Sequence, residues 1–323
     1  MTQFLKLLDW IDINKLDWYY LSVNPNAIHL ISEALEQNRD KIYWRELSRN
    51  PGAIHLLERN IDKINWDNLS KNSNAIHLLE QNPNKICWYD LSGNPNAIHI
   101  LEKKPNKIYW TNLSQNPNAI DLLEKNIDKI YWPILSGNPG AIHLLEKNPD
   151  KINWHWLSGN LNAIHLLEQN IDKINWWHLS GNLNAIHLLE QNPDKIEWDM
   201  LSKNPNAIHL ISEALEQNFD KIDWCELSSN PGAIHLLEKN IDKIYWCKLS
   251  SNPGAIHLLE KNQDKINWDE LCYNPAICTY DYDKIRAHCL IFKEDIMKNR
   301  FHPRNIPKFR DWGIDGFEDY EEE

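Results

Sequence analysis

Ten histidines occupy one position of a recurring sequence, and histidine is a common metal ligand in proteins. If the copies stack as helices, equivalent side chains lie about 8–10 Å apart. Zinc binds a histidine nitrogen at about 2.1 Å, so such neighbours cannot share one ion. We therefore predict no metal site and solvated histidines near the glutamate three residues later, as in His55 and Glu58. The ten are His29, His55, His77, His99, His143, His165, His187, His209, His235 and His257, and Asp121 takes this position in one further copy.

The two positions after each repeated tryptophan vary in size, charge and aromaticity, whereas the positions around them recur. Stacking of the copies does not dictate these residues, so we expect them to bind a partner. Two neighbouring copies concentrate aromatic rings there, and exposed tryptophans are enriched at binding hot spots. Local packing of these rings under a loop is the alternative. The candidate partner-binding residues are His155, Trp156, Trp177, His178, Tyr89, Tyr109 and Tyr131.

The familiar sequence motifs of enzymes do not occur in the chain. It contains no nucleophile elbow, P-loop or HExxH motif, and no paired carboxylates outside the repeats. A residue that is copied ten times serves the stacking of the copies rather than one reaction centre. We therefore predict that the protein is not an enzyme and uses no cofactor.

Tryptophans mark twelve copies of the recurring unit, which are 22 residues apart except for two intervals of 26. The consensus is NPDKIxWxxLSx followed by NPNAIHLLEx. Asn and Asp are good helix N-caps and Pro favours the first helical position, so each copy predicts two short helices. In the first half we expect Asp62 to cap a helix, with Ile61 and Trp66 as a hydrophobic staple. The tryptophan and leucine of each copy are expected to form the core.

The 26-residue copies favour helices over strands. The segment AIHLISEALEQN at 27–38 and 207–218 has four more residues than AIHLLEQN, about one helical turn. Such an insertion lengthens a helix without rotating its apolar face. The residue between Ile and Trp, such as Asn65 or Glu197, fits poorly, because a continuous helix would bury it. Either the isoleucine precedes the helix, or the segment is extended as in a leucine-rich repeat.

We therefore predict an all-α fold, an α-solenoid of about twelve short helix-turn-helix repeats. A leucine-rich-repeat-like horseshoe is the alternative. Residues 1–12 are expected to form an N-terminal capping helix, 13–274 the tandem repeats, 275–310 a C-terminal capping helix region and 311–323 an acidic tail. Capping units cover the last apolar faces of an open array, so we expect an elongated or curved particle.

Composition narrows the classes of partner. The formal net charge of −12 makes nucleic acid an unlikely partner, because phosphate contacts need a basic surface. Six cysteines form no CxxC pair, and no apolar run reaches the length of a membrane span. The first residues lack the apolar region of a signal peptide. We predict a monomeric, cytoplasmic protein in a reducing compartment, with no membrane contact.

The unit LSxNPNAIHLLExNPDKIxW resembles the 22-residue helical-repeat families of giant DNA viruses of amoebae, such as mimivirus-like viruses. The ending resembles them too, in FHPRNI at 301–306 and the acidic stretch after it. The resemblance covers nearly the whole chain and implies an interaction protein, with no catalytic residues to transfer. We predict a non-enzymatic scaffold for protein–protein interaction, as a viral protein acting on host or viral partners. A solenoid that binds single-stranded RNA is the alternative.

Overall fold

The computed structural model describes residues 4–37, 42–217, 221–299 and 302–305. The chain divides into two units, the repeat array Leu8–Ile277 and a smaller unit formed by Met1–Leu7 with Cys278–Glu323. The predicted acidic tail at 311–323 lies outside the described residues. None of the helices described is both long and apolar enough to cross a membrane.

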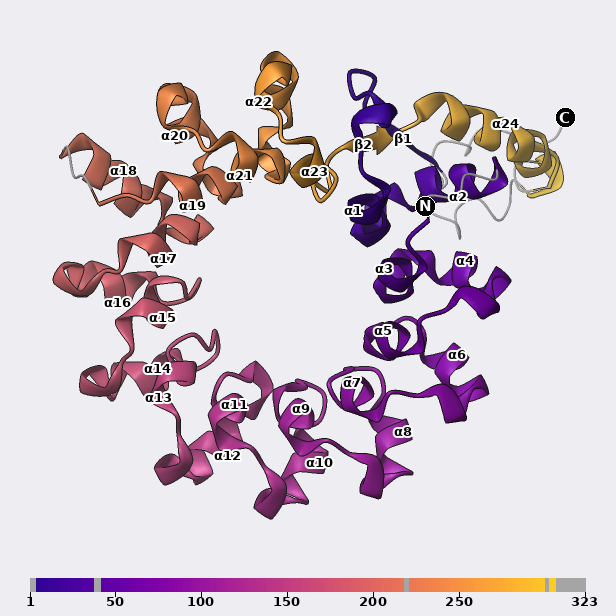
Figure 1. Ribbon diagram of the computed structural model, residues 1–323. Helices are drawn as coiled ribbons and strands as arrows, with labels where there is room; N and C mark the ends of the chain where they lie inside the picture. The colour runs from indigo at the N-terminus through magenta and orange to yellow at the C-terminus, as the bar shows by residue number, and fades with distance from the viewer. Residues whose placement is uncertain (1–3, 38–41, 218–220, 300–301, 306–323) are drawn as a thin grey trace, which may run out of the picture. The chain divides into compact units, whose positions relative to one another are not determined.

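Short helices make up the array, and the prediction of an all-α solenoid is confirmed (Figure 1). The first helix of each repeat begins at its tryptophan: α1 Trp18–Val23, α3 Trp44–Arg49, α5 Trp66–Lys71, α7 Trp88–Ser92, α9 Trp110–Gln115, α11 Trp132–Ser136, α13 Trp154–Leu157, α15 Trp176–Ser180, α17 Trp198–Lys203, α19 Trp224–Ser229, α21 Trp246–Ser250 and α23 Trp268–Leu271. The second helix begins at the isoleucine: α2 Ile28–Glu36, α4 Ile54–Arg59, α6 Ile76–Gln81, α8 Ile98–Glu102, α10 Ile120–Glu124, α12 Ile142–Lys147, α14 Ile164–Glu168, α16 Ile186–Gln191, α18 Ile208–Glu216, α20 Ile234–Lys239 and α22 Ile256–Lys261.

The approach to each first helix differs from the prediction. Ile61–Lys63 form a single 3-10 turn, Ile64 is extended, and α5 begins only at Trp66. Asn65 is the N-cap, because its Oδ1 accepts a hydrogen bond from the Asn68 backbone N–H at 2.9 Å. The expected cap at Asp62 and its staple are therefore wrong. The isoleucine precedes the helix, which explains why the next position tolerates polar residues.

The second half of each repeat follows the predicted cap pattern. Asn138 accepts a hydrogen bond from the Gly140 N–H at 3.0 Å, Pro139–Ala141 form a 3-10 turn, and α12 continues from it. In the 26-residue repeats, α2 and α18 have nine residues where α12 has six. The prediction that the insertion lengthens a helix is confirmed.

The core lies between the two rows of helices. The leucine three residues after each tryptophan is fully buried, as Leu91 and Leu135 show with 0% exposure. The tryptophans themselves are half-buried, apart from Trp18 at 9% exposure. Several are covered by a lysine of the next repeat, such as Lys85, whose Nζ lies 4.7 Å from the centre of the Trp66 ring. The leucines therefore form the core as expected, whereas the tryptophans lie at its edge.

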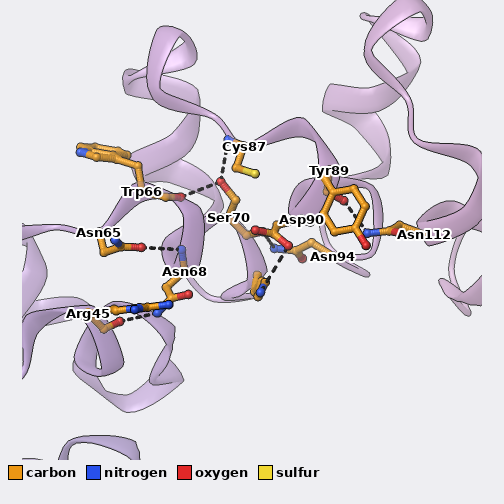
Figure 2. A network of polar contacts seen from close by, with 11 residues as sticks. Arg45, Asn65, Trp66, Asn68, Ser70, Cys87, Tyr89, Asp90, Asn94 and Asn112 are labelled. Carbon is orange, nitrogen blue, oxygen red and sulfur yellow. Dashed lines mark hydrogen bonds and ion pairs between the residues drawn. The ribbon is translucent and has the colours of Figure 1, made fainter.

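A recurring asparagine joins each repeat to the one before it. The Asn94 Nδ2 donates to the carbonyls of Ser70 at 3.0 Å and Asn72 at 3.2 Å. The Ser70 hydroxyl donates to the Trp66 carbonyl at 2.8 Å and accepts from the Cys87 N–H at 3.1 Å (Figure 2). Because these buried groups are satisfied only across the joint, both the asparagine and the serine recur in the sequence.

The last repeat joins the first through the same contacts. The Asn24 Nδ2 donates to the carbonyls of Cys272 at 2.8 Å and Asn274 at 3.0 Å. Cys272 occupies the serine position, and its Sγ donates to the Trp268 carbonyl at 3.2 Å, as the Ser70 hydroxyl does to the Trp66 carbonyl. The array Leu8–Ile277 is therefore a closed ring of twelve repeats, and the expected open array with two capped ends is wrong.

A lysine completes the joint between the last and first repeats, which we call the seam. The Lys15 Nζ lies 4.7 Å from the centre of the Trp268 ring, as Lys85 does over Trp66. At the seam, the apolar face of one repeat is thus covered by another repeat rather than by a capping unit.

The smaller unit contains the strand β1 Leu5–Leu7, which pairs antiparallel with β2 Cys278–Tyr280. The predicted N-terminal capping helix at 1–12 is therefore wrong. The alternation of Leu5, Lys6 and Leu7 has the period of a strand, and β2 satisfies its backbone groups. The predicted C-terminal helix is present as α24 Tyr282–Asn299.

Candidate interaction surface

Helix geometry determines which way the side chains point at the two variable positions after each tryptophan. In α13, Trp154 and Leu157 with the following Ser158 lie on one side, because residues three and four apart share a helix face. His155 and Trp156 lie on the opposite side, and both are exposed. The first helices form the inner row of the ring and the second helices the outer row (Figure 1). We therefore call the variable positions the inner face.

Two neighbouring repeats bring the predicted rings together as one aromatic cluster, defined as His155, Trp156, Trp177 and His178. The His155 and His178 ring centres lie 4.1 Å apart, and the Trp177 and His178 ring centres 4.8 Å apart. Trp156 is 48% exposed and Trp177 is 43% exposed. Both tryptophans are accessible, so the alternative that they are packed under a loop is wrong.

Small residues on the preceding repeat leave room for these rings. Gly137 and Gly159 end the first helices of their repeats. A Cβ at Gly137 would lie 3.8 Å from the Trp156 Cβ, and one at Gly159 would lie 3.8 Å from the His178 Cβ. A longer side chain at either glycine would extend into the space beside these rings.

The two histidines of the cluster share a hydrogen bond between their Nε2 atoms, which lie 2.8 Å apart. One ring must donate and the other accept, so at least one of them is neutral at this nitrogen. Burial lowers the pKa of His178, and the charge of His155 lowers it further. The argument that neighbouring histidines lie too far apart to share one metal ion therefore does not apply to His155 and His178. The described residues nevertheless include no group of three or more potential metal ligands.

The other candidate residues lie apart from the aromatic cluster. Tyr89, Tyr109 and Tyr131 are 54%, 51% and 47% exposed. Tyr89 and Tyr109 meet edge to face, with their ring centres 5.4 Å apart. Within the described part of the chain, no ring contact joins these three to the aromatic cluster.

A second group of rings lies at the seam, and sequence reasoning missed it. The ring centres of Tyr19 and Tyr20 lie 5.2 Å apart, those of Tyr19 and Tyr43 5.2 Å, and those of Tyr20 and Tyr273 5.0 Å. We call Tyr19, Tyr20, Tyr43 and Tyr273 the seam cluster. The adjacent Tyr19 and Tyr20 were a signal, but Tyr273 joins them only because the ring closes.

Carboxylates surround the seam cluster. Burial raises the pKa of Tyr20, and the charges of Asp269, Asp17 and Glu270 raise it further. Burial likewise raises the pKa of Tyr273, with contributions from neighbouring tyrosines and then from Glu270 and Glu46. Asp17 also caps α1 by accepting from the Tyr19 N–H at 2.7 Å. The seam thus combines aromatic surface with negative charge.

Seven of the ten recurring histidines pair with a glutamate of the preceding repeat rather than within their own helix. The His77 Nε2 lies 2.8 Å from the Glu58 Oε1, which corrects the expected pairing of His55 with Glu58. Both side chains of this pair are nearly half exposed, as predicted for a solvated position. The same pairing joins His99 to Glu80, His143 to Glu124, His165 to Glu146, His187 to Glu168, His209 to Glu190 and His257 to Glu238.

Comparisons with known proteins find no relative of this chain. No protein family, no curated protein and no solved structure matches the chain. The resemblance to repeat families of giant viruses therefore stays a prediction.

Proposed function

We propose that the protein is a non-enzymatic scaffold that binds a protein partner on the inner face of its ring. The observation that carries the proposal is the exposure of large rings at positions that vary from one repeat to the next. Trp156 and Trp177 keep 48% and 43% of their surface accessible. Tryptophans that are exposed and held by neighbours are the residues that most often dominate protein interfaces.

The ring has room for a polypeptide. Packed helices lie about 8–10 Å apart, so twelve first helices in a closed row give a diameter of about 31–38 Å between helix axes. A helix with its side chains is about 10–12 Å wide, which leaves an opening of about 20–28 Å. An extended chain or a single helix fits within that width.

Charge favours a protein over RNA as the partner. The two variable positions of the twelve repeats hold seven acidic residues, namely Glu46, Asp67, Asp90, Asp199, Glu226, Asp269 and Glu270. They hold two basic residues, Arg45 and Lys248. A face with this balance repels phosphates, so the alternative of a solenoid that binds single-stranded RNA lacks its main source of affinity.

Partner capture from a lysate of the native cell tests the proposal. The double variant Trp156→Ala with Trp177→Ala removes the two anchors, and each contributes about 2 kcal/mol or more if it is a hot spot. We expect the variant to lose specific partners that wild-type protein retains, with an unchanged urea melt.

The matched control is Leu161→Ala with Leu183→Ala, in the same two repeats but outside the inner face. These leucines are 39% and 37% exposed, so the control removes apolar surface of similar accessibility. If both double variants retain every partner, Trp156 and Trp177 are not the anchors of the binding surface. Salt-dependent binding of single-stranded RNA by wild-type protein would instead favour the RNA-binding alternative.

A further inference from the structure

The seam cluster presents accessible tyrosine faces next to several carboxylates. Tyr19, Tyr43 and Tyr273 are 39%, 47% and 39% exposed. Tyr19 meets both Tyr20 and Tyr43 edge to face, at interplanar angles of 81° and 89°. The rings are thus held by one another while part of each stays open to a ligand.

The carboxylates beside these rings keep their charge available. Among the described residues, no lysine or arginine forms an ion pair with Asp269 or Glu270. Two other acids of the inner face are paired with a lysine: Asp90 lies 3.3 Å from Lys71, and Glu226 lies 3.4 Å from Lys203. At the seam, Asp269 and Glu270 therefore lie beside aromatic surface, with Lys15 close by over the Trp268 ring.

The site exists only in the closed ring. Tyr273, Asp269 and Glu270 belong to the last repeat, whereas Tyr19 and Tyr20 belong to the first. The contact between Tyr20 and Tyr273 depends on the joint that Asn24 makes with Cys272 and Asn274.

We propose that the seam cluster binds the cationic side chain of a lysine or arginine in a basic segment of a partner polypeptide. This proposal rests on the proposed function, because Tyr19, Tyr20, Asp269 and Glu270 belong to the same inner face, and it adds the chemistry of the partner. A cation over a tyrosine face is attracted by the ring quadrupole, and nearby carboxylates add to that attraction.

Other ligand classes fit the seam less well. A phosphate or an acidic peptide would meet the charges of Asp17, Asp269 and Glu270. An apolar peptide would cover these carboxylates without pairing them, which costs free energy. A cationic side chain can both contact the faces of the rings and pair with the carboxylates.

The test uses the full chain and a defined probe, a fluorescein-labelled peptide of alternating arginine and glycine, measured by fluorescence anisotropy. A peptide of the same length with glutamine in place of arginine is the probe control. We expect the arginine peptide to bind more tightly than the glutamine peptide, and to weaken as salt rises, because salt screens exposed charges.

Two pairs of matched variants locate the binding. Tyr19→Ala with Tyr43→Ala is compared with Tyr89→Ala with Tyr109→Ala, which removes a somewhat more exposed edge-to-face pair away from the seam. Asp269→Asn with Glu270→Gln is compared with Asp67→Asn with Asp90→Asn, which changes the net charge equally. Circular dichroism and urea melts establish that each variant is folded.

We expect each seam variant to lower the affinity for the arginine peptide by about twofold to thirtyfold more than its control variant does. This range corresponds to the free energy of a cation–π contact. Equal losses in seam and control variants would overturn the proposal, as would equal binding of the two peptides by wild-type protein. Either result leaves the partner capture by Trp156 and Trp177 intact, so failure here is distinct from failure of the proposed function.

Discussion

The seam cluster and the aromatic cluster occupy related positions of the same repeat but are built in different ways. The aromatic cluster joins repeats seven and eight, and its residues are 23 or fewer positions apart in the sequence. The seam cluster joins the last repeat to the first, and Tyr20 and Tyr273 are 253 positions apart. One cluster combines tryptophan with histidine, and the other combines tyrosine with carboxylates. The comparison shows that one scaffold offers chemically distinct surfaces without any change at its joints.

Thiol reactivity gives the largest expected difference between the seam and the rest of the array. Cys272 is 0% exposed, and burial raises its pKa to about 12, whereas Cys247 in the preceding repeat is exposed. At pH 8 a shift from 9 to about 12 lowers the thiolate fraction about a thousandfold. We expect iodoacetamide to modify Cys247 and spare Cys272, as measured by peptide mass spectrometry.

Equal labelling of the two cysteines would mean that the seam is open.

The raised pKa of Cys272 also predicts a change in stability with pH. Because the folded thiol keeps its proton up to about pH 12 and the unfolded thiol loses it near pH 9, the free energy of unfolding should fall as pH rises through this range. Cys272→Ser should remove this contribution.

The asparagine joints give the next largest effect. Asn24→Ala removes the donors to Cys272 and Asn274 at the seam, and Asn182→Ala removes the same donors between repeats seven and eight. Each loss leaves buried carbonyls unsatisfied and should cost about 3 kcal/mol in the free energy of unfolding. Urea denaturation should give the two variants similar values. A seam variant as stable as wild type would show that the seam is not a true joint.

The contact of a lysine with a tryptophan ring should have a smaller effect on stability, and it too can be compared at the seam and elsewhere in the array. The Lys15 Nζ lies 4.7 Å from the centre of the Trp268 ring at the seam, and the Lys173 Nζ lies 4.8 Å from that of Trp154. Replacing either lysine with glutamine should lower the free energy of unfolding by about 0.5–1 kcal/mol, the strength of an exposed cation–π contact. A loss at Lys173 with none at Lys15 would contradict the equivalence of the two joints.

The smallest effect concerns the histidine pair of the aromatic cluster. Because burial and His155 lower the pKa of His178, the folded protein takes up this proton at lower pH than the unfolded chain. The free energy of unfolding should therefore fall as pH drops below about 6.5, the ordinary histidine value. In His155→Ala the pKa of His178, followed by NMR, should rise. A pKa that stays the same would exclude His155 as a cause.

Sequence periodicity predicted most of the local structure, because each repeat carries its own helix signals. The asparagine before the proline correctly predicted a cap in the second half of the repeat but not in the first, and the insertion in α2 and α18 predicted longer helices. The Asp62 cap was wrong because Asp62 and Asn65 are both capping residue types, three positions apart. Only the folded backbone shows which of them precedes the helix.

Closure of the ring could not be predicted from the sequence. It depends on the small rotation between neighbouring repeats, summed over the array, and no residue type encodes that sum. Cys272 even departs from the serine consensus, although its carbonyl accepts from Asn24 as the serine carbonyls accept from the asparagine of the next repeat. The exposure of Trp156 and Trp177 was predicted from variability alone, whereas Tyr273 gave no signal that it would meet Tyr20.

Closure also restricts how the gene for such a chain can grow. Twelve repeats that return to their starting point turn by 30° each on average, since a full circle is shared among them. An open array tolerates an added or lost copy at either end. Here a thirteenth copy would require every joint to tighten, or would leave a gap that no asparagine spans. Closure thus fixes the number of copies, while it places no such constraint on the two residues after each tryptophan.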